Sequence, residues 1–146
     1  MTDKDGNAWV RATSEWAVLS LAKRRASRIP DFLANAGFAY PEYIMDAPDY
    51  KIPSAEDFPV LRITHANDDD IDINDHVNNV RYVKWIERAV PEDVPIRSFE
   101  ILYKKEALLG DQIFAKGGPC RDKRDCYIVS LYRKDGEIVQ SRINGL

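Results

Sequence analysis

Cysteine is scarce in this chain of 146 residues, which contains only Cys120 and Cys126. Two cysteines make no disulfide framework, and their spacing matches no common zinc signature. Structural disulfides are rare in reducing compartments. The cysteine content therefore predicts a protein of a reducing compartment, in which both cysteines are ordinary strand or turn residues.

Long apolar runs are also absent. The longest one near the N-terminus, Trp16–Ala22, is interrupted by Ser20 and follows a charged stretch, so it is not a secretory signal. A membrane-spanning helix needs about 20 predominantly apolar residues, and no segment approaches that length. We therefore expect a soluble, cytoplasmic protein without a membrane partner.

Neither sign of charge dominates, since 21 Lys and Arg residues stand against 24 Asp and Glu residues. A sequence pI near 5.4 gives no general attraction for nucleic acid or anionic membranes, so we expect no nucleic-acid partner. A hydrophobic content of 45% argues against intrinsic disorder. The length suits one ordinary domain, which can build a core without disulfide or metal.

The N-terminal part of the chain has little regular pattern. Residues 8–22 mix alternating and continuous apolar character, which predicts one or two strands. A short helix is predicted at 31–36, because Pro30 precedes it and Gly37 follows it. Residues 38–59 contain four prolines and no sustained periodicity, which predicts an extended linker that is not packed.

The pattern becomes regular from residue 60 onward. Val60–His65 alternates as a strand does, and apolar residues at three- and four-residue spacing predict a helix over Val77–Val90. Four more strands are predicted at Ile96–Glu106, Gln112–Gly117, Cys126–Arg133 and Ile138–Ile143. Short turns join them, including Asp135-Gly136 and a Gly-Gly-Pro break after residue 116, and force antiparallel pairing. One long helix against an antiparallel sheet is an α+β architecture.

A polar motif that contains Asp72, Asn74 and His76 directly precedes the predicted helix. In an extended chain these three alternating side chains would point the same way. His76 lies where free backbone N–H groups and the positive end of the helix dipole gather. Neutral polar groups beside such donors suit the binding of a carbonyl whose oxygen becomes negative.

Other interpretations of this segment remain open from the residues alone. Asp72 or Asn74 by itself is typical of a helix cap, and the acidic run Asp68–Asp70 is typical of a solvated loop. A calcium-binding loop counted from Asp68 places Ile73 where glycine is required and Asn79 where a glutamate belongs. The sequence therefore disfavours a calcium site.

The motif at 72–79, Asp-Ile-Asn-Asp-His-Val-Asn-Asn, followed by Tyr82 and Trp85, resembles the hot-dog thioesterases that hydrolyse fatty acyl-acyl carrier protein in plants and bacteria. Residues 103–106, Tyr-Lys-Lys-Glu, are similar to a strand of that family whose glutamate is catalytic. Residues 9–30 resemble the end of the family's N-terminal hot-dog domain and the start of its interdomain segment.

The resemblance implies an α+β hot-dog fold, an antiparallel sheet wrapped around one long helix. It implies that residues 1–37 are a remnant of a truncated first hot-dog domain, 38–59 a Pro-rich linker and 60–146 the C-terminal thioesterase domain. Single hot-dog domains elsewhere usually dimerise edge to edge, so we expect a homodimer.

The resemblance assigns the catalytic roles to Asp72, Asn74, His76 and Glu106. Glu106 would act as general base on a water, assisted by His76, while Asn74 and helix N–H groups hold the thioester carbonyl and Asp72 orients its neighbours. Many relatives carry cysteine directly after the glutamate, where this sequence has Ala107. A thiol nucleophile at that position is thus excluded, which leaves a water mechanism.

The implied function is hydrolysis of fatty acyl-acyl carrier protein (ACP) thioesters, without cofactor or metal and with acyl-ACP as the partner. The alternative is a non-catalytic acyl-thioester-binding or structural hot-dog dimer derived from a truncated thioesterase. The intact motif favours the enzyme, whereas the missing first domain favours the alternative.

Overall fold

The computed structural model of the chain describes residues 3–8, 12, 14, 17–20, 25–35 and 51–145. The chain divides into two compact units, Met1–Ala47 and Pro48–Leu146. Each unit is considered by itself below. Among the described residues, no helix has both the length and the apolar character that crossing a membrane requires.

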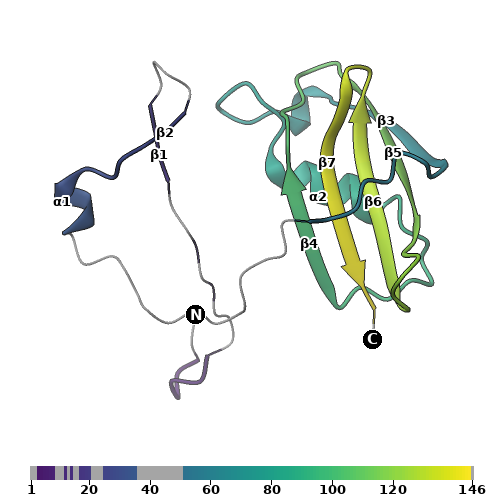
Figure 1. Ribbon diagram of the computed structural model, residues 1–146, viewed down its shortest axis with the longest axis horizontal. Coiled ribbons are helices and arrows are strands. Elements are labelled where there is room, and N and C mark those ends of the chain that lie inside the picture. Colours follow the sequence, from purple (N-terminus) through teal and green to yellow (C-terminus); the bar gives the residue numbers. More distant parts are fainter. Residues whose placement is uncertain are drawn as a thin grey trace. The chain divides into compact units, whose positions relative to one another are not determined.

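The first unit contains a small hairpin and a short helix. Strand β1 (Val18–Ser20) pairs antiparallel with β2 (Arg25–Ser27), and helix α1 (Asp31–Ala34) follows (Figure 1). The predicted strand region and short helix are both present, and the helix begins directly after Pro30. Much of the predicted segment 8–22, residues 36 and 37, and residues 38–50 of the predicted linker lie outside the described residues.

The second unit is built on one five-stranded antiparallel sheet. Its strands are β3 (Val60–His65), β4 (Ser98–Tyr103), β5 (Gln112–Pro119), β6 (Cys126–Arg133) and β7 (Gly136–Asn144). They lie in the order β3-β5-β6-β7-β4, so the first two strands of the unit form the two edges (Figure 1). The α+β architecture and all five predicted strands are confirmed.

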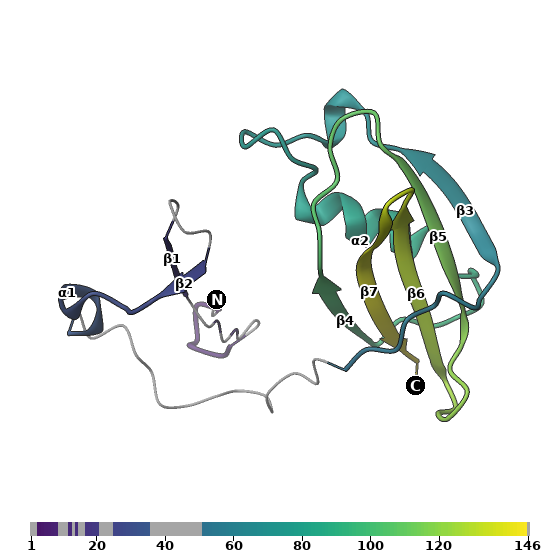
Figure 2. The same cartoon turned by 45° about the horizontal axis from the view of Figure 1, so that its top comes forward.

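Helix α2 (Asn79–Glu87) connects β3 to β4 and packs on one face of this sheet (Figure 2). Its buried side chains are Tyr82, Trp85 and Ile86. They belong to one core cluster with residues of β6 and β7, among them Val129, Leu131, Val139 and Ile143. Full burial of an apolar side chain of this size contributes about 1.5–3 kcal/mol, so this layer holds the unit together.

The helix is shorter than the predicted Val77–Val90. Val77 forms an isolated β-bridge with Ile71, so it cannot be helical. Asn78 is the N-cap, and its side chain accepts a 3.0 Å hydrogen bond from the Val80 N–H. Apolar periodicity continues into this bridge without a break, which is why it predicted a longer helix.

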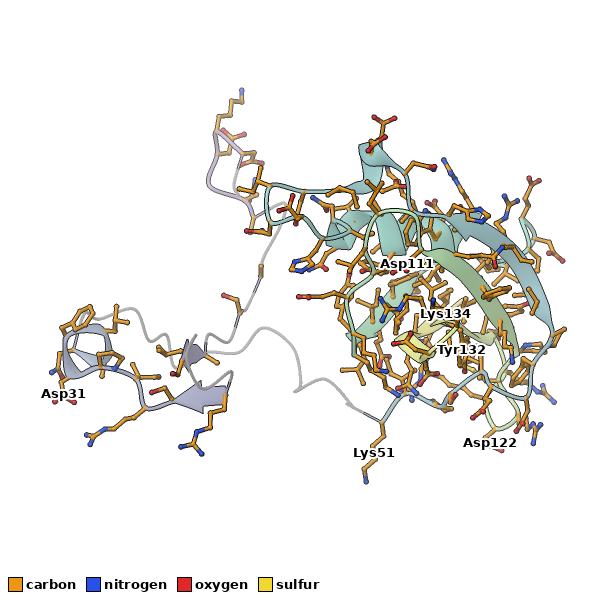
Figure 3. All side chains as sticks on the ribbon, turned by 90° about the horizontal axis from the view of Figure 1, so that it is seen from above. Asp31, Lys51, Asp111, Asp122, Tyr132 and Lys134 are labelled. Carbon is orange, nitrogen blue, oxygen red and sulfur yellow. A yellow bond between two sulfur atoms is a disulfide. The ribbon has the colours of Figure 1, made fainter. Side chains whose placement is uncertain are left out.

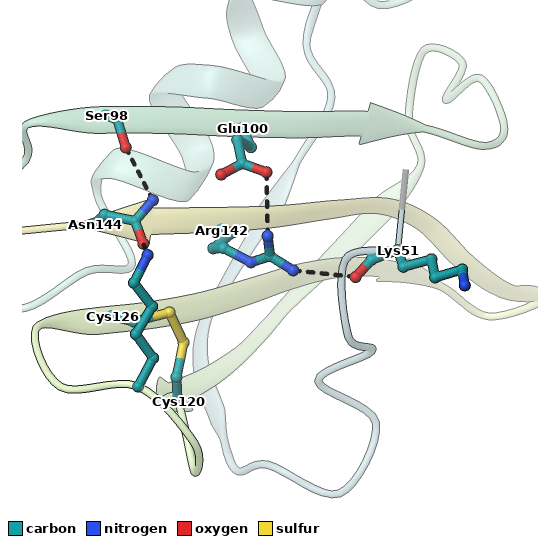
Figure 4. Close-up of a disulfide and its surroundings, with 8 residues drawn as sticks. Lys51, Ser98, Glu100, Cys120, Cys126, Arg142 and Asn144 are labelled. Carbon is teal, nitrogen blue, oxygen red and sulfur yellow. Dashed lines mark hydrogen bonds and ion pairs between the residues drawn. A yellow bond between two sulfur atoms is a disulfide. The ribbon is translucent and has the colours of Figure 1, made fainter. Parts of the chain in front are cut away.

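Residues 51–59, predicted to be an unpacked linker, instead pack against the sheet. Ile52 and Ala55 are buried. Ser54 Oγ lies 2.9 Å from the hydroxyl of Tyr132, which is labelled in Figure 3. Arg142 donates a 3.0 Å hydrogen bond to the Lys51 carbonyl (Figure 4). The prolines therefore indicate irregular backbone here, but the apolar residues between them still pack into the core.

Gly117 and Gly118 lie within β5, although they were predicted to end that strand. A Cβ at Gly118 would collide with the Phe58 ring, and a Cβ at Gly117 would collide with the backbone oxygen of Ile128. The two glycines thus leave room for the 51–59 segment and for close approach of β6, rather than forming a turn.

Cys120 and Cys126 form a disulfide across the β5–β6 hairpin (Figure 4). The expectation of two ordinary, unpaired cysteines was therefore wrong. The hairpin returns the chain on itself, so that their Cα atoms are 5.2 Å apart, within the range that a disulfide spans. The inference of a reducing compartment from cysteine content loses its basis as a result.

Candidate active site

An open hollow of about 1120 Å³ lies at the N-terminal end of α2. It is lined by the segment before α2, by the first turns of that helix, by the end of β4 with the segment that follows, and by the end of β6. The lining residues are Asp72, Asn74, His76, Val77, Asn78, Asn79, Tyr82, Tyr103, Lys104, Lys105, Glu106, Leu108 and Arg133. All four residues predicted for catalysis therefore line the same hollow.

His76 and Glu106 form the central contact of this hollow. The Nε2 atom of His76 lies 3.2 Å from Oε2 of Glu106, and both side chains reach solvent, with exposed fractions of 39% and 71%. An imidazole nitrogen and a carboxylate oxygen at this separation form an ion pair when the imidazole is protonated, and water has access to both. Such a pair has the composition of a general acid–base site.

Asp72 and Asn74 reach the hollow from a tight turn, not from an extended segment. The Asp72 N–H donates a 2.8 Å hydrogen bond to the His76 carbonyl, and Asp75 has a positive φ of 62°. The alternation argument thus predicted the wrong local structure. Asp72 Oδ1 accepts the Asn74 N–H at 2.8 Å, which fixes the backbone of Asn74 beside it.

Two amides at the start of α2, those of the N-cap Asn78 and of Val80, already have partners. The Asn78 N–H donates to the Asp70 carbonyl at 2.8 Å, and the Val80 N–H donates to Asn78 Oδ1 at 3.0 Å. These bonds compete with the role predicted for helix N–H groups in holding a substrate carbonyl. The exposed side-chain amide of Asn74 is the other donor that the prediction named.

The segment that carries Glu106 is anchored through its next residue, Ala107. The Ala107 N–H donates a 2.8 Å hydrogen bond to the Tyr82 hydroxyl, and the Ala107 carbonyl accepts the Val77 N–H at 3.0 Å. Burial raises the pKa of Tyr82, and the negative charge of Glu106 adds to this rise. Tyr82 belongs to the motif, but sequence reasoning gave it no role, because its contact with Ala107 is tertiary.

Arg133 was not predicted for the site, yet its guanidinium lines the hollow. It lies 2.9 Å from Asp111 and 2.7 Å from Asp135. Hydrogen bonds from Arg133 lower the pKa of Asp135 to about 2. Lys104, which also lines the hollow, pairs with Glu137 at 2.5 Å. The basic side chains of this wall are therefore largely neutralised by neighbouring carboxylates.

The acidic run Asp68–Asp70 forms a short 3-10 helix. Asp70 is buried, and its Oδ1 lies 3.3 Å from Nε of Arg81. Within residues 51–145 and the described parts of the first unit, no three His, Cys, Asp or Glu side chains are grouped so that they could hold a metal ion.

A family model described as the acyl-ACP thioesterase C-terminal domain matches residues 55–141. A chloroplastic palmitoyl-acyl carrier protein thioesterase of Cuphea hookeriana is 30% identical over 69% of this chain and 27% of its own length. A chloroplastic dodecanoyl-[acyl-carrier-protein] hydrolase of Cinnamomum camphora is 31% identical over 73% of this chain and 30% of its own length. The chain thus spans under a third of these curated relatives.

Solved structures share the fold. The chain is similar to an acyl-ACP thioesterase from Bacteroides thetaiotaomicron, with a TM-score of 0.71 and 21% identity over 86% of this chain and 52% of that one. A 12:0-ACP thioesterase from Umbellularia californica gives a TM-score of 0.66 at 21% identity, with the same coverage of both chains. The hot-dog fold predicted from the motif is confirmed by these neighbours.

Proposed function

Since the chain belongs to the acyl-ACP thioesterase family, whose C-terminal domain it matches over residues 55–141, we propose that it hydrolyses fatty acyl-ACP thioesters to free fatty acid and ACP. The observation that carries this proposal is the 3.2 Å contact between His76 and Glu106 in an open hollow. Asp72 and Asn74 line the same hollow and complete the proposed catalytic group.

In the proposed reaction Glu106 takes a proton from a water molecule, and His76 orients the same water. The oxygen of that water bonds to the thioester carbon. The developing negative charge falls on the carbonyl oxygen, where the side-chain amide of Asn74 donates a hydrogen bond. The carbon–sulfur bond then breaks, and the departing thiolate recovers the proton that the His76–Glu106 pair holds.

Ala107 bears on the route of the reaction. Its side chain carries no nucleophile and is fully buried. A covalent acyl-enzyme at this position is therefore excluded, and water remains as the attacking group. Asp72 keeps its proposed role of orienting Asn74, which its 2.8 Å bond to the Asn74 N–H supports.

We further propose acyl-ACP as the partner and a homodimer as the active assembly. Large apolar side chains stand exposed in the hollow and next to its lining residues in the sequence: Leu108 lines it and is 47% exposed, and the adjacent Leu109 is 56% exposed. A second hot-dog domain would cover them, and residues 1–37 are proposed as the end of such a domain. The solved neighbours align with 86% of this chain, a larger share than the Pro48–Leu146 unit makes up by itself.

One observation favours the alternative of a non-catalytic or structural hot-dog dimer. Glu106 is 71% exposed, whereas a general base works best where water is restricted and the substrate is enclosed. In this alternative the hollow binds an acyl thioester without hydrolysing it. The activity test below separates the two functions.

The location within the cell is also a proposal. The curated relatives are named as chloroplastic, whereas the composition of this chain led to the expectation of the cytoplasm. We propose the cytoplasm, although the Cys120–Cys126 disulfide argues against a reducing compartment; fractionation of the source cells followed by immunodetection of the chain tests it.

The test of the function is thiol release from a panel of acyl-ACP substrates. We expect turnover by the wild type and a loss of at least about 100-fold for Glu106→Gln, the size of a positioned acid–base group. Glu87→Gln is the matched control, because Glu87 is an exposed glutamate at the end of α2 outside the hollow. A folded wild type that releases no thiol above background would establish the non-catalytic alternative.

A further inference from the structure

The backbone of Ala107, the residue that follows Glu106, is held by two hydrogen bonds. The Ala107 N–H donates to the Tyr82 hydroxyl at 2.8 Å, and the Ala107 carbonyl accepts from the Val77 N–H at 3.0 Å. Glu106 directly precedes Ala107, and His76 directly precedes Val77. The backbones of both members of the His76–Glu106 pair are thus tied to one buried residue.

We infer that Tyr82 is a positioning residue for Glu106: its hydroxyl holds the Glu106–Ala107 peptide so that the carboxylate stays within reach of His76. The inference rests on the proposed thioesterase function and adds a residue to it. Tyr82 does not need to touch the substrate in this role, since it acts through the backbone.

Tyr82 is well suited to serve as a fixed anchor. It is only 2% exposed, and its ring makes edge contacts with Trp85 at 5.5 Å and Tyr103 at 5.7 Å between ring centroids. The ring therefore cannot move without disturbing the core of the unit. A rigid aromatic side chain on a helix transmits the position of α2 to the segment after β4.

Glu106 itself has few restraints of its own. It lies beyond the end of β4, and its side chain is 71% exposed. The ion pair with His76 at such an exposed site is worth little by itself. The position of the carboxylate therefore depends on its backbone, and a misplacement of about 1 Å in a reacting group can lower the rate by about 100-fold.

Tyr82→Phe tests the inference, because it removes the hydroxyl and keeps the ring. We expect kcat for acyl-ACP hydrolysis to fall by about 10- to 100-fold with KM little changed. The matched control is Tyr127→Phe, which removes a hydroxyl at the end of β6 opposite to Arg133 and the hollow. We expect Tyr127→Phe to keep the wild-type kcat, and thermal unfolding verifies that both variants fold.

A double variant separates positioning from a general loss of structure. If Tyr82 acts through Glu106, adding Tyr82→Phe to Glu106→Gln will cause little further loss of kcat. If Tyr82→Phe lowers kcat by the same factor in the wild type and in Glu106→Gln, the inference is overturned.

Hydrogen exchange gives a second readout that needs no activity. The Ala107 amide should exchange faster in Tyr82→Phe, and an unchanged exchange rate also overturns the inference.

The outcomes keep this inference distinct from the proposed function. If Glu106→Gln lowers kcat by at least about 100-fold and Tyr82→Phe keeps the wild-type kcat, the function stands and the inference fails. If Glu106→Gln hydrolyses acyl-ACP as fast as the wild type, the general-base role of Glu106 fails, and a positioning role for Tyr82 fails with it. If the folded wild type releases no thiol from acyl-ACP, the proposed function itself fails.

Discussion

Arg133 and Asp135 form a two-point contact across the turn between β6 and β7, in which Nε donates to one carboxylate oxygen at 2.8 Å and Nη2 to the other at 2.7 Å. The same guanidinium donates to Asp111 at 2.9 Å. Asp111 in turn accepts the Leu108 N–H at 2.9 Å. Arg133 therefore connects this turn to the loop that follows Glu106.

This contact makes stability depend on pH in the acid range. The pKa of Asp135 is about 2, below its ordinary value of 3.8, because Arg133 stabilises the charged form. A carboxyl group whose pKa is lower in the folded chain stabilises the fold above its unfolded pKa, and this contribution is lost as the pH falls through the folded value. The window therefore runs from about pH 4 down to about pH 2.

We expect Asp135→Asn to be less stable than the wild type near neutral pH and the difference to vanish toward about pH 2. Urea unfolding of both proteins across this range measures it. Asp57→Asn, which changes an exposed aspartate before β3, is the control and should follow the wild type at every pH. A wild-type advantage that stays constant down to the acid end would contradict the assignment to Arg133.

Much of the second unit could be predicted because its strands carry local signals. Cys126–Arg133 was predicted with the bounds that β6 has, and the other strands were predicted within a few residues. The turn after it was placed one residue too late, since Lys134 and Asp135 form the loop and Gly136 already pairs with Arg133. Alternation and turn residues are local properties of the sequence, so they can be recognised without knowledge of the tertiary structure.

The site was predicted only in part. The resemblance named His76 and Glu106, which lie 3.2 Å apart although 30 residues separate them in the sequence. Tyr82 and Arg133 were not predicted, because their roles depend on where other segments fold. The extended geometry assumed for 72–76 was wrong for a related reason: the hydrogen bond from Asp72 to His76 closes a turn that alternation does not reveal.

Packing of the 51–59 segment can be tested at Gly118. Because a Cβ at this position would collide with the Phe58 ring, we expect Gly118→Ala to lower the free energy of unfolding by about 1–3 kcal/mol, the usual cost of overpacking. Chemical denaturation measures the change. Adding Phe58→Leu should recover part of the loss, with Phe58→Leu alone as the control. A neutral Gly118→Ala would show that Phe58 does not pack there.

The disulfide offers a test that leaves the proposed site untouched. It joins two cysteines with a sequence separation of 6, at the end of β6 opposite to Arg133. A cross-link of a loop this short stabilises by about 2 kcal/mol, chiefly by restricting the unfolded chain. We therefore expect a reductant to lower the melting temperature of the wild type. The rate of acyl-ACP hydrolysis, measured from the fatty acid formed, should stay the same.

Cys120→Ser supplies the matched comparison for this experiment. Cys120 is partly exposed whereas Cys126 is buried, so replacing Cys120 removes the cross-link with the smaller disturbance of packing. The variant should melt near the temperature of the reduced wild type and should not respond to reductant. If reductant lowers the melting temperature of both proteins equally, the loss does not come from the Cys120–Cys126 bond. If activity falls together with stability, the hairpin communicates with the His76–Glu106 pair along β6, whose far end positions Arg133 in the hollow.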